Sequence, residues 1–193
     1  MSYLFKAHEV SPFAYIEGMF SKEECESIVA IGAKIGTVDA EVINDQTSIK
    51  SLDTSFRISK NCFIPYGANT DWLYKRLASA SVHLNQKFFN FDLTGFIEDV
   101  QFAQYFAPDG KFARHTDCVL FGITRKLSIS VQLSDENNYE GGDLELDYGT
   151  AIKMPRKQGT VIAFPSFAVH EITPVTAGER CSLVAWIAGP EFK

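Results

Sequence analysis

The chain has 193 residues, of which 46% are hydrophobic and 22% charged, a composition typical of a soluble globular protein with one core. Its formal net charge of −6 argues against a protein that holds the nucleic-acid backbone without regard to sequence. The start of the chain lacks the apolar core of a signal peptide, and no run of residues approaches a transmembrane span. We therefore expect a cytoplasmic protein with reduced thiols.

The N-terminal part predicts a strand followed by a helix. Residues 14–20 form a short apolar stretch, and Ser21 with Glu24 matches a capping box, in which each residue bonds the other's backbone amide. A helix is expected from there to about Ile35, closed by Gly36. After it we expect extended residues 37–43, a polar loop over 44–55 and a strand over 56–64.

A second helix is predicted after Pro65. The segment from Asn69 to Asp71 offers an N-cap, and apolar residues then recur at helical spacing: Trp72, Leu73, Leu77, Ala80, Leu84 and Phe88. We interpret this stripe as core packing.

Beyond Asn90 the pattern changes to short β-type runs. They cover residues 98–106, 111–117, 127–133, 143–148, 160–164, 168–173 and 180–188, with Gly, Pro, Asn and Asp between them. Two helices followed by many short strands indicate an α+β chain with a barrel or sandwich. No linker or repeat interrupts the chain, so we expect one domain over residues 1–193.

His115 and Asp117 stand two residues apart in one predicted strand. Residues two apart on a strand point to the same face, so an imidazole and a carboxylate would converge on one point. His8 lies at the start of the chain and His83 in the predicted second helix, which leaves His170 as the natural third ligand. Two imidazoles and one carboxylate form the facial triad typical of non-haem Fe(II), although the residues alone leave zinc open.

Arg180 begins the last predicted strand, ten residues after His170. A turn at Thr176-Ala-Gly178 between adjacent antiparallel strands would return it near the metal site. A guanidinium is costly to bury unless it meets an anion, and a dicarboxylic cosubstrate would provide one. The alternative is an exposed arginine after a glycine-containing turn.

Several motifs in order resemble the catalytic domain of 2-oxoglutarate- and Fe(II)-dependent oxygenases. They are Tyr105, His115-x-Asp117, Tyr139-Glu-Gly-Gly-Asp-Leu144, His170-Glu-Ile-Thr-Pro-Val-Thr-Ala-Gly-Glu-Arg180 and Trp186. The resemblance covers about residues 99–190 and is greatest to prolyl 4-hydroxylase-like and bacterial PKHD-type hydroxylases. It implies a double-stranded β-helix (jelly-roll) core over residues 96–190, with residues 1–95 as helical and strand support.

The same resemblance implies roles for individual residues. The iron ligands would be His115, Asp117 and His170. Arg180 would bind the distal carboxylate of 2-oxoglutarate, where collagen-type enzymes carry a lysine. The cosubstrate pocket would include Tyr105, Leu144, Gln132 and Trp186, although related enzymes often place an aromatic residue at the position of Gln132. Thr173 and Ser182 are weaker candidates for the pocket lining.

The implied activity is that of a dioxygenase (hydroxylase). Fe(II), 2-oxoglutarate and O2 would be its cofactors and cosubstrates, with ascorbate as a reductant. It would convert 2-oxoglutarate to succinate and CO2 and hydroxylate an unactivated C–H bond. No catalytic base or nucleophile is needed, which agrees with the lack of a serine or cysteine constellation.

The substrate is open at this point. A peptidyl residue, with proline first, is the leading hypothesis, and a free amino acid or another small molecule is the alternative. Residues 44–57 and 118–126 are candidate substrate-binding segments. The acidic balance disfavours nucleobase demethylation. A cupin-like metal protein without O2 chemistry belongs to another class, but it would need neither Arg180 nor the Tyr105 pattern, and a non-catalytic interaction module would not need the triad.

Overall fold

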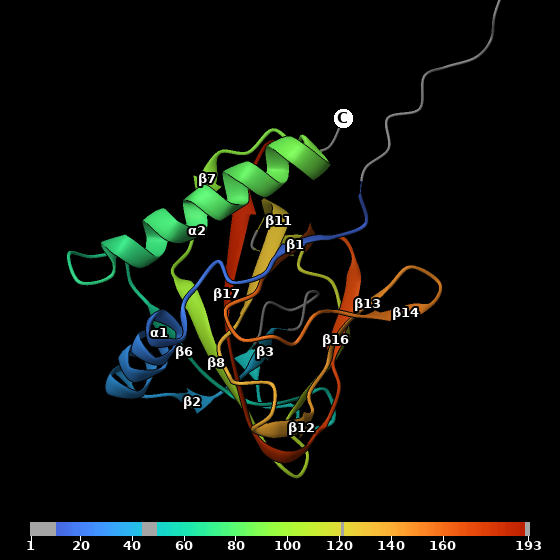
Figure 1. Cartoon of the computed structure of the whole chain (residues 1–193). Helices are drawn as coiled ribbons and strands as arrows, with labels where there is room; N and C mark the ends of the chain where they lie inside the picture. The colour runs from blue at the N-terminus through green and yellow to red at the C-terminus, as the bar shows by residue number, and fades with distance from the viewer. Residues whose placement is uncertain (1–10, 44–49, 121, 192–193) are drawn as a thin grey trace, which may run out of the picture.

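The computed structural model describes residues 11–43, 50–120 and 122–191. His8 and residues 44–49 of the predicted polar loop lie outside the described residues. Two β-sheets pack face to face, and the two α-helices cover the outer face of the larger sheet (Figure 1). This arrangement confirms the predicted α+β architecture.

The N-terminal half carries both α-helices and short strands. Its elements are β1 (Ala14–Ile16), α1 (Lys22–Ile35), β2 (Val38–Asp39), β3 (Val42–Ile43), β4 (Lys50–Ser51), β5 (Arg57–Ile58), β6 (Lys60–Ile64), α2 (Asp71–Leu84) and the π-helical turn η1 (Asn85–Phe89). The capping box is confirmed, because Ser21 Oγ accepts from the Glu24 amide at 3.2 Å and Glu24 Oε2 accepts from the Ser21 amide at 2.8 Å.

Two expectations in this half need correction. The first strand ends at Ile16 rather than residue 20. The predicted strand over residues 56–64 is two strands, because β5 pairs with β9 in one sheet and β6 pairs with β8 in the other. The chain therefore crosses between the sheets at Ser59, which strand propensity alone does not reveal. Helix α2 begins at Asp71 as predicted, but Thr70 makes no side-chain cap bond.

The C-terminal half is β-rich, and each of the predicted runs contains a strand. The strands are β7 (Gly95–Phe96), β8 (Val100–Phe106), β9 (Lys111–His115), β10 (Val119–Leu120), β11 (Ile123–Gln132), β12 (Tyr139–Gly141), β13 (Leu144–Asp147), β14 (Ala151–Lys153), β15 (Val161–Pro165), β16 (Val169–Ile172) and β17 (Val175–Ala188).

The larger sheet has ten strands, with the main order β1-β15-β11-β17-β8-β6-β2, and β10, β12 and β7 pair off this path. The smaller sheet has the order β14-β13-β16-β9-β5, and β3 pairs with β4 separately. Some strands that are consecutive in the chain thus alternate between the sheets, as with β15, β16 and β17. Because of this alternation, residues distant in sequence meet in the space between the sheets.

Side-chain alternation along the central strands separates two cores. On β17 the odd-numbered residues from Cys181 to Ile187 pack under the helices, and the even-numbered residues from Ser182 to Trp186 line the space between the sheets. The same period on β11 places leucine, isoleucine and valine under the helices and turns the polar residues inward: Ser128, Ser130 and Gln132. The interior between the sheets is therefore polar on one wall.

The last strand differs from the prediction. β17 begins at Val175, so the proposed turn at residues 176–178 lies within the strand and Arg180 is well inside it. Nor is β17 the neighbour of β16: β17 pairs with β11 and β8, whereas β16 pairs with β13 and β9. The chain crosses from the smaller sheet to the larger one between β16 and β17. This crossing, and not a β-hairpin, brings Arg180 to the site.

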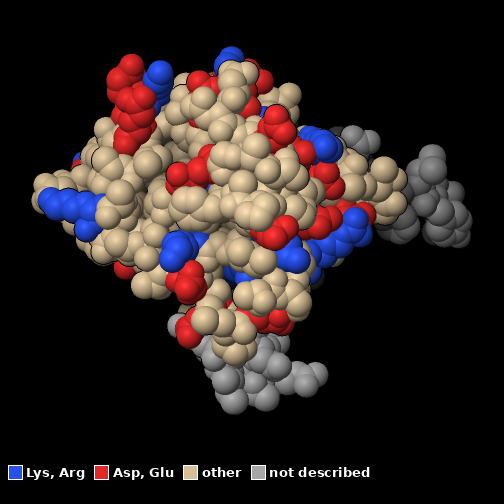
Figure 2. Space-filling model, turned by 90° about the horizontal axis from the view of Figure 1, so that it is seen from below, with Lys and Arg blue, Asp and Glu red and all other residues tan. Residues whose placement is uncertain are grey.

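Lysine, arginine, aspartate and glutamate side chains of the described residues are interspersed on the face seen in Figure 2. This mixture agrees with the modest acidic balance of the chain. Among the described residues, no helix combines the length and the apolar character that crossing a membrane requires.

Candidate active site

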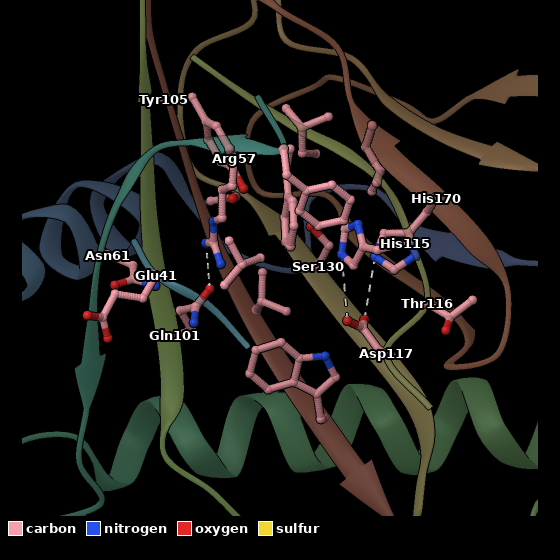
Figure 3. Close-up of a pocket in the computed structure, with 18 of the residues that line it drawn as sticks. Glu41, Arg57, Asn61, Gln101, Tyr105, His115, Thr116, Asp117, Ser130 and His170 are labelled. Atoms are coloured by element: carbon pink, nitrogen blue, oxygen red, sulfur yellow. Dashed lines mark hydrogen bonds and ion pairs between the residues drawn. The ribbon is translucent and has the colours of Figure 1, made fainter. Parts of the chain in front are cut away.

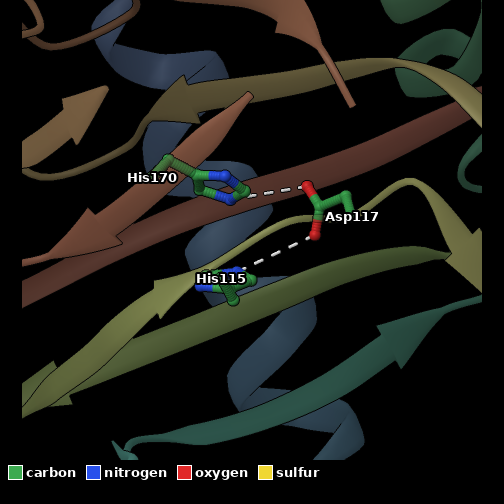
Figure 4. A group of neighbouring side chains, drawn as sticks. All are labelled: His115, Asp117 and His170. Atoms are coloured by element: carbon green, nitrogen blue, oxygen red, sulfur yellow. Dashed lines mark ion pairs between the residues drawn. The ribbon is translucent and has the colours of Figure 1, made fainter. Parts of the chain in front are cut away.

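His115, Asp117 and His170 come together between the two sheets. Each offers one ligand atom, and these atoms lie within 4.8 Å of one another (Figure 4). His115 Nε2 is 3.8 Å from Asp117 Oδ1, and His170 Nε2 is 3.5 Å from Asp117 Oδ2. His115 is the direct cross-strand partner of His170 in the β9–β16 pair. The structure thus assembles the three residues that the sequence singled out.

Backbone carbonyls orient both imidazoles. His115 Nδ1 lies 2.8 Å from the carbonyl oxygen of Ala113, and His170 Nδ1 lies 3.0 Å from that of Ala168. A carbonyl only accepts, so each Nδ1 carries the hydrogen and each Nε2 keeps its lone pair. Both lone pairs are therefore available to a cation beside Asp117.

Asp117 reaches this position for a reason the sequence did not show. β9 ends at His115, so the alternation expected for a strand through residue 117 does not apply. Instead, the Asp117 amide donates to the carbonyl oxygen of Ser166 at 2.8 Å, and Ser128 Oγ donates to Asp117 Oδ2 at 2.8 Å. Tertiary contacts to the other sheet, and not the strand period, aim the carboxylate at the imidazoles.

The environment keeps His115 and Asp117 in their metal-binding protonation states. Burial lowers the pKa of His115 to about 4, helped by the neighbouring His170, so His115 is neutral near pH 7. Burial alone would raise the pKa of Asp117, but the adjacent imidazoles, the Trp186 indole and the hydrogen bond from Ser128 outweigh it and hold this pKa below its ordinary value. A neutral nitrogen and an ionised carboxylate are what a divalent cation requires.

Arg180 is fully buried, with 0% of its surface exposed. Its Nη1 donates to Ser182 Oγ at 3.1 Å and its Nη2 to Gln132 Oε1 at 3.0 Å, while its Nε has no hydrogen-bond partner. Within residues 11–43, 50–120 and 122–191 the guanidinium forms no ion pair. A buried cation of this kind lacks several kcal/mol of compensation until an anion reaches it.

The remaining predicted pocket residues fall into two groups. Tyr105, Leu144 and Trp186 are buried and line a cavity of about 1190 Å³ that also contains the triad. Tyr105 is the cross-strand partner of Arg180, whose guanidinium lies 5.4 Å from the centre of the Tyr105 ring. Gln132 does not line the cavity and instead links Arg180 to the carbonyl oxygen of Pro155.

The two weaker candidates for the pocket lining, Ser182 and Thr173, also differ in location. Ser182 lines the cavity and accepts from Arg180. Thr173 Oγ1 accepts from the amide of Asp143 at 2.8 Å and has a local structural role in the chain between β16 and β17. Arg180 is fully buried beside this cavity, and its contacts Tyr105 and Ser182 are among the residues that line it.

Arg57 and Gln101 also line the cavity, and of the two the sequence analysis named only Arg57, within the candidate substrate-binding segment 44–57. Arg57 is 7% exposed, donates to Ser59 Oγ at 2.7 Å and Gln101 Oε1 at 3.0 Å, and lies 4.4 Å from the centre of the Phe112 ring. Figure 3 shows Arg57 and Gln101 on the side of the cavity opposite the triad. In the sequence, Arg57 stood out only as an arginine inside the predicted strand 56–64, and nothing in the sequence marked Gln101.

An ion pair borders the cavity. Arg125 Nε and Nη2 donate to the two carboxylate oxygens of Glu98, each at 2.7 Å, and the guanidinium lies 3.9 Å from the centre of the Trp186 ring. Arg125 belongs to the predicted segment 118–126, and it lines the cavity. The pair holds Trp186 in place near the triad.

The donor set fits a divalent iron. Two neutral imidazole nitrogens and one carboxylate are typical of non-haem Fe(II) sites, which keep further positions open for small ligands. The orphaned Nε of Arg180, held among neutral partners, likewise fits a carboxylate ligand.

Curated relatives share sequence with part of the chain. A PKHD-type hydroxylase of Synechococcus sp. (strain CC9311) is 36% identical over 81 residues, which are 41% of this chain and 37% of the relative. Another, from Picosynechococcus sp., is 34% identical over 95 residues, which are 47% of this chain and 42% of the relative. Over these residues the chain is similar to the PKHD-type hydroxylases. The match spans well under half the length of each relative, and the chain matches no protein-family model.

Solved structures show the same fold. A prolyl hydroxylase from Trichoplax adhaerens, in complex with a hypoxia inducible factor peptide fragment, has a TM-score of 0.75 at 16% identity and covers 92% of this chain and 84% of that one. A viral collagen prolyl hydroxylase from Paramecium Bursaria Chlorella virus-1, in its 2OG complex, has a TM-score of 0.69 at 20% identity, over 94% and 97% of the two chains. The fold is the double-stranded β-helix of the prolyl hydroxylases, as the resemblance implied.

Proposed function

We propose that this protein is an Fe(II)- and 2-oxoglutarate-dependent hydroxylase acting on a peptidyl residue, with proline as the first candidate. The observation that carries the proposal is the meeting of His115, Asp117 and His170 beside a buried arginine without a counter-ion. Relatives named hydroxylases and similar structures of prolyl hydroxylases support it.

In this proposal the three triad residues hold Fe(II) through the two Nε2 atoms and the Asp117 carboxylate. Arg180 provides the charge for the distal carboxylate of 2-oxoglutarate, assisted by Ser182 and Tyr105. When bound, iron would supply the oxidative chemistry with O2 as the oxidant: one oxygen atom would enter succinate as 2-oxoglutarate loses CO2, and the other would hydroxylate a C–H bond. Ascorbate, as a reductant of the iron, is part of the same proposal.

The protein contributes orientation and a dry site. Tyr105, Leu144 and Phe164 make apolar contacts in the core between the sheets, and Leu144 and Tyr105 also face the cavity. Such a wall limits the entry of water around the reacting groups. Arg180 is fully buried, so binding of the cosubstrate requires a movement of the guanidinium or of the side chains packed around it.

The leading substrate class rests on the neighbours. The Trichoplax enzyme is described with a peptide fragment and the viral enzyme as a collagen prolyl hydroxylase. The cavity of about 1190 Å³ is large enough for more than the cosubstrate and extends to residues of β2 and β6. A free amino acid or small molecule with the same chemistry is the second candidate.

Two measurements test the proposal. Fe(II) and 2-oxoglutarate added together without oxygen should give a visible charge-transfer band, while either alone, or Zn(II) with 2-oxoglutarate, should not. In air, peptides containing proline should gain one oxygen by mass spectrometry, with matching succinate release, and free amino acids serve as the comparison set. A colourless complex with iron and 2-oxoglutarate would refute the oxygenase; oxygen added only to free amino acids would refute the peptidyl substrate.

A further inference from the structure

Two buried hydroxyls stand directly behind the triad. Ser128 on β11 and Ser166, which follows β15, are each 0% exposed. Their Oγ atoms lie 2.9 Å apart, and Ser128 Oγ lies 2.8 Å from Asp117 Oδ2. The three side chains form a short chain of hydrogen bonds that connects the larger sheet to the carboxylate.

The direction of these hydrogen bonds follows from proton counting. The ionised Asp117 carboxylate can only accept, so Ser128 must donate its single hydroxyl proton to Oδ2. Ser128 then has none left for Ser166, so the second bond is donated by Ser166 Oγ to Ser128 Oγ. Bonds aligned in this way polarise one another, which strengthens the one that reaches the carboxylate.

The same pair also fixes the backbone of Asp117. The Asp117 amide donates to the Ser166 carbonyl oxygen at 2.8 Å, and the Ser166 amide donates to the Lys126 carbonyl oxygen at 3.0 Å. Because Asp117 lies beyond the end of β9, no strand ladder holds it. Its position depends on these contacts at both its backbone and its side chain.

Neutral donors have a particular consequence at a cation site. An arginine or lysine at the place of Ser128 would also stabilise the carboxylate, but it would cancel the negative charge that attracts a metal. A hydroxyl favours the ionised form and leaves the site's charge intact. It donates to Oδ2, whereas Oδ1 is the oxygen that lies 3.8 Å from His115 Nε2.

We propose that Ser128, backed by Ser166, is the positioning residue that holds Asp117 as a ligand for the divalent metal. The inference rests on the proposed function for the identity of the ion, since the triad is the site concerned. Residues that orient a metal ligand through a hydrogen bond typically change metal affinity by about 10- to 100-fold when removed.

The test measures metal binding and needs no turnover. Co(II) is added to the metal-free protein in competition with a chelating indicator, and visible absorption reports the coordination. Ser128→Ala should weaken Co(II) binding by about 10- to 100-fold and change the absorption of the bound ion. Ser128→Thr keeps the hydroxyl and should recover most of the affinity.

Ser130 offers a matched control. It lies two residues further along the same face of β11 and is also buried, but it makes no hydrogen bond to Asp117. Ser130→Ala removes the same atom from the same strand and should leave Co(II) affinity unchanged. An equal loss in Ser128→Ala and Ser130→Ala would indicate general loosening of the strand and would overturn the inference.

Ser166→Ala tests whether Ser166 acts on Asp117 through Ser128. Because Ser166 acts on Asp117 through Ser128, Ser166→Ala should weaken Co(II) binding by less than the roughly 10- to 100-fold expected for Ser128→Ala. The double variant should then be no weaker than Ser128→Ala alone, since the outer hydroxyl has nothing left to polarise. If the losses of Co(II) affinity in the two single variants add up in the double variant, Ser166 does not act through Ser128. If Ser128→Ala fails to fold, Ser128→Thr and Ser166→Ala carry the test with the same expectations.

The outcomes separate the two proposals. A wild-type protein that binds no divalent metal would refute the proposed function. A wild-type protein that binds Co(II), with Ser128→Ala binding equally well, would refute the positioning role and leave the proposed function standing.

Discussion

The triad and the Arg180 corner are both buried between the sheets, yet they are built in opposite ways. At the triad, lone pairs of His115, Asp117 and His170 face one another, so the region lacks a cation. At the other corner, the Arg180 guanidinium has only neutral partners and lacks an anion. A metal ion would supply the missing cation at the triad, and a carboxylate ligand would supply the missing anion at Arg180.

The two regions also differ in what holds them. The triad is held by neutral hydroxyls and carbonyls, namely those of Ser128, Ser166 and the histidine-flanking backbone. Residues 141–143, which pack against Arg180, are held by charged side chains. Arg156 Nη1 donates to the Gly141 carbonyl oxygen at 2.7 Å and to Asp143 Oδ1 at 2.6 Å, and a Cβ on Gly142 would lie 3.1 Å from Arg180 Cδ. We therefore expect the two corners to respond differently to mutation and to pH.

The largest effect is expected from removing a triad imidazole. His170→Ala takes away one of the two neutral nitrogen ligands, and the remaining pair cannot surround an ion. We expect loss of Co(II) binding in the indicator assay and loss of iron-dependent succinate release. His83→Ala, which changes an exposed histidine on α2, is the control and should keep wild-type metal affinity. Full metal binding by His170→Ala would exclude this residue from the site.

Arg180 should affect the two ligands unequally. Under the proposed function, Arg180→Ala would remove charge-assisted hydrogen bonds to the distal carboxylate of 2-oxoglutarate, worth about 1.5–3 kcal/mol each. The apparent KM for 2-oxoglutarate should then rise on the order of 100-fold while the iron requirement changes little. Titration of each ligand against succinate release measures both. Equal effects on the two requirements would indicate a structural arginine.

A companion variant sharpens this result. Arg180→Met replaces a buried, uncompensated cation by an apolar side chain of similar length, so the ligand-free protein should be at least as stable as wild type to urea. A clear loss of stability would mean that the hydrogen bonds to Gln132 and Ser182 compensate the charge better than the structure suggests.

The smallest effect concerns pH and the ionic clamp at Asp143. Burial opposes its ionisation, but hydrogen bonds from Lys153 and Arg156 hold the pKa of Asp143 below its ordinary value of 3.8. A lowered folded-state pKa stabilises the protein above the unfolded-state value, and this contribution is lost as the pH falls through the folded-state value.

Asp143→Asn should therefore cost about 1 kcal/mol at pH 7, after allowance for solvent screening, and the gap to wild type should narrow below pH 3.8. Urea unfolding across this pH range measures it. Asp109→Asn, at an exposed turn between β8 and β9, is the matched control and should show no such gap. If the difference in unfolding free energy between Asp143→Asn and wild type persists unchanged below pH 3.8, the ionised Asp143 does not stabilise the protein through Lys153 and Arg156.

The sequence by itself determined the local features. Ser21 and Glu24 cap α1 because their interaction spans one turn, and Gly36 ends the helix because it adopts a φ of 89°. The β-rich second half followed from periodicity and turn residues. The choice of His115, Asp117 and His170 followed from ligand chemistry and the family resemblance.

Only the tertiary structure decided how these pieces meet. The crossing at Ser59, the placement of β16 and β17 in different sheets, and the contact of Asp117 with Ser128 and Ser166 depend on pairing between distant strands. In β11 the pattern of alternating polar residues would ordinarily indicate a solvent-exposed face, but here that face is covered by the second sheet. Periodicity shows which residues share a face, whereas long-range packing decides what that face meets.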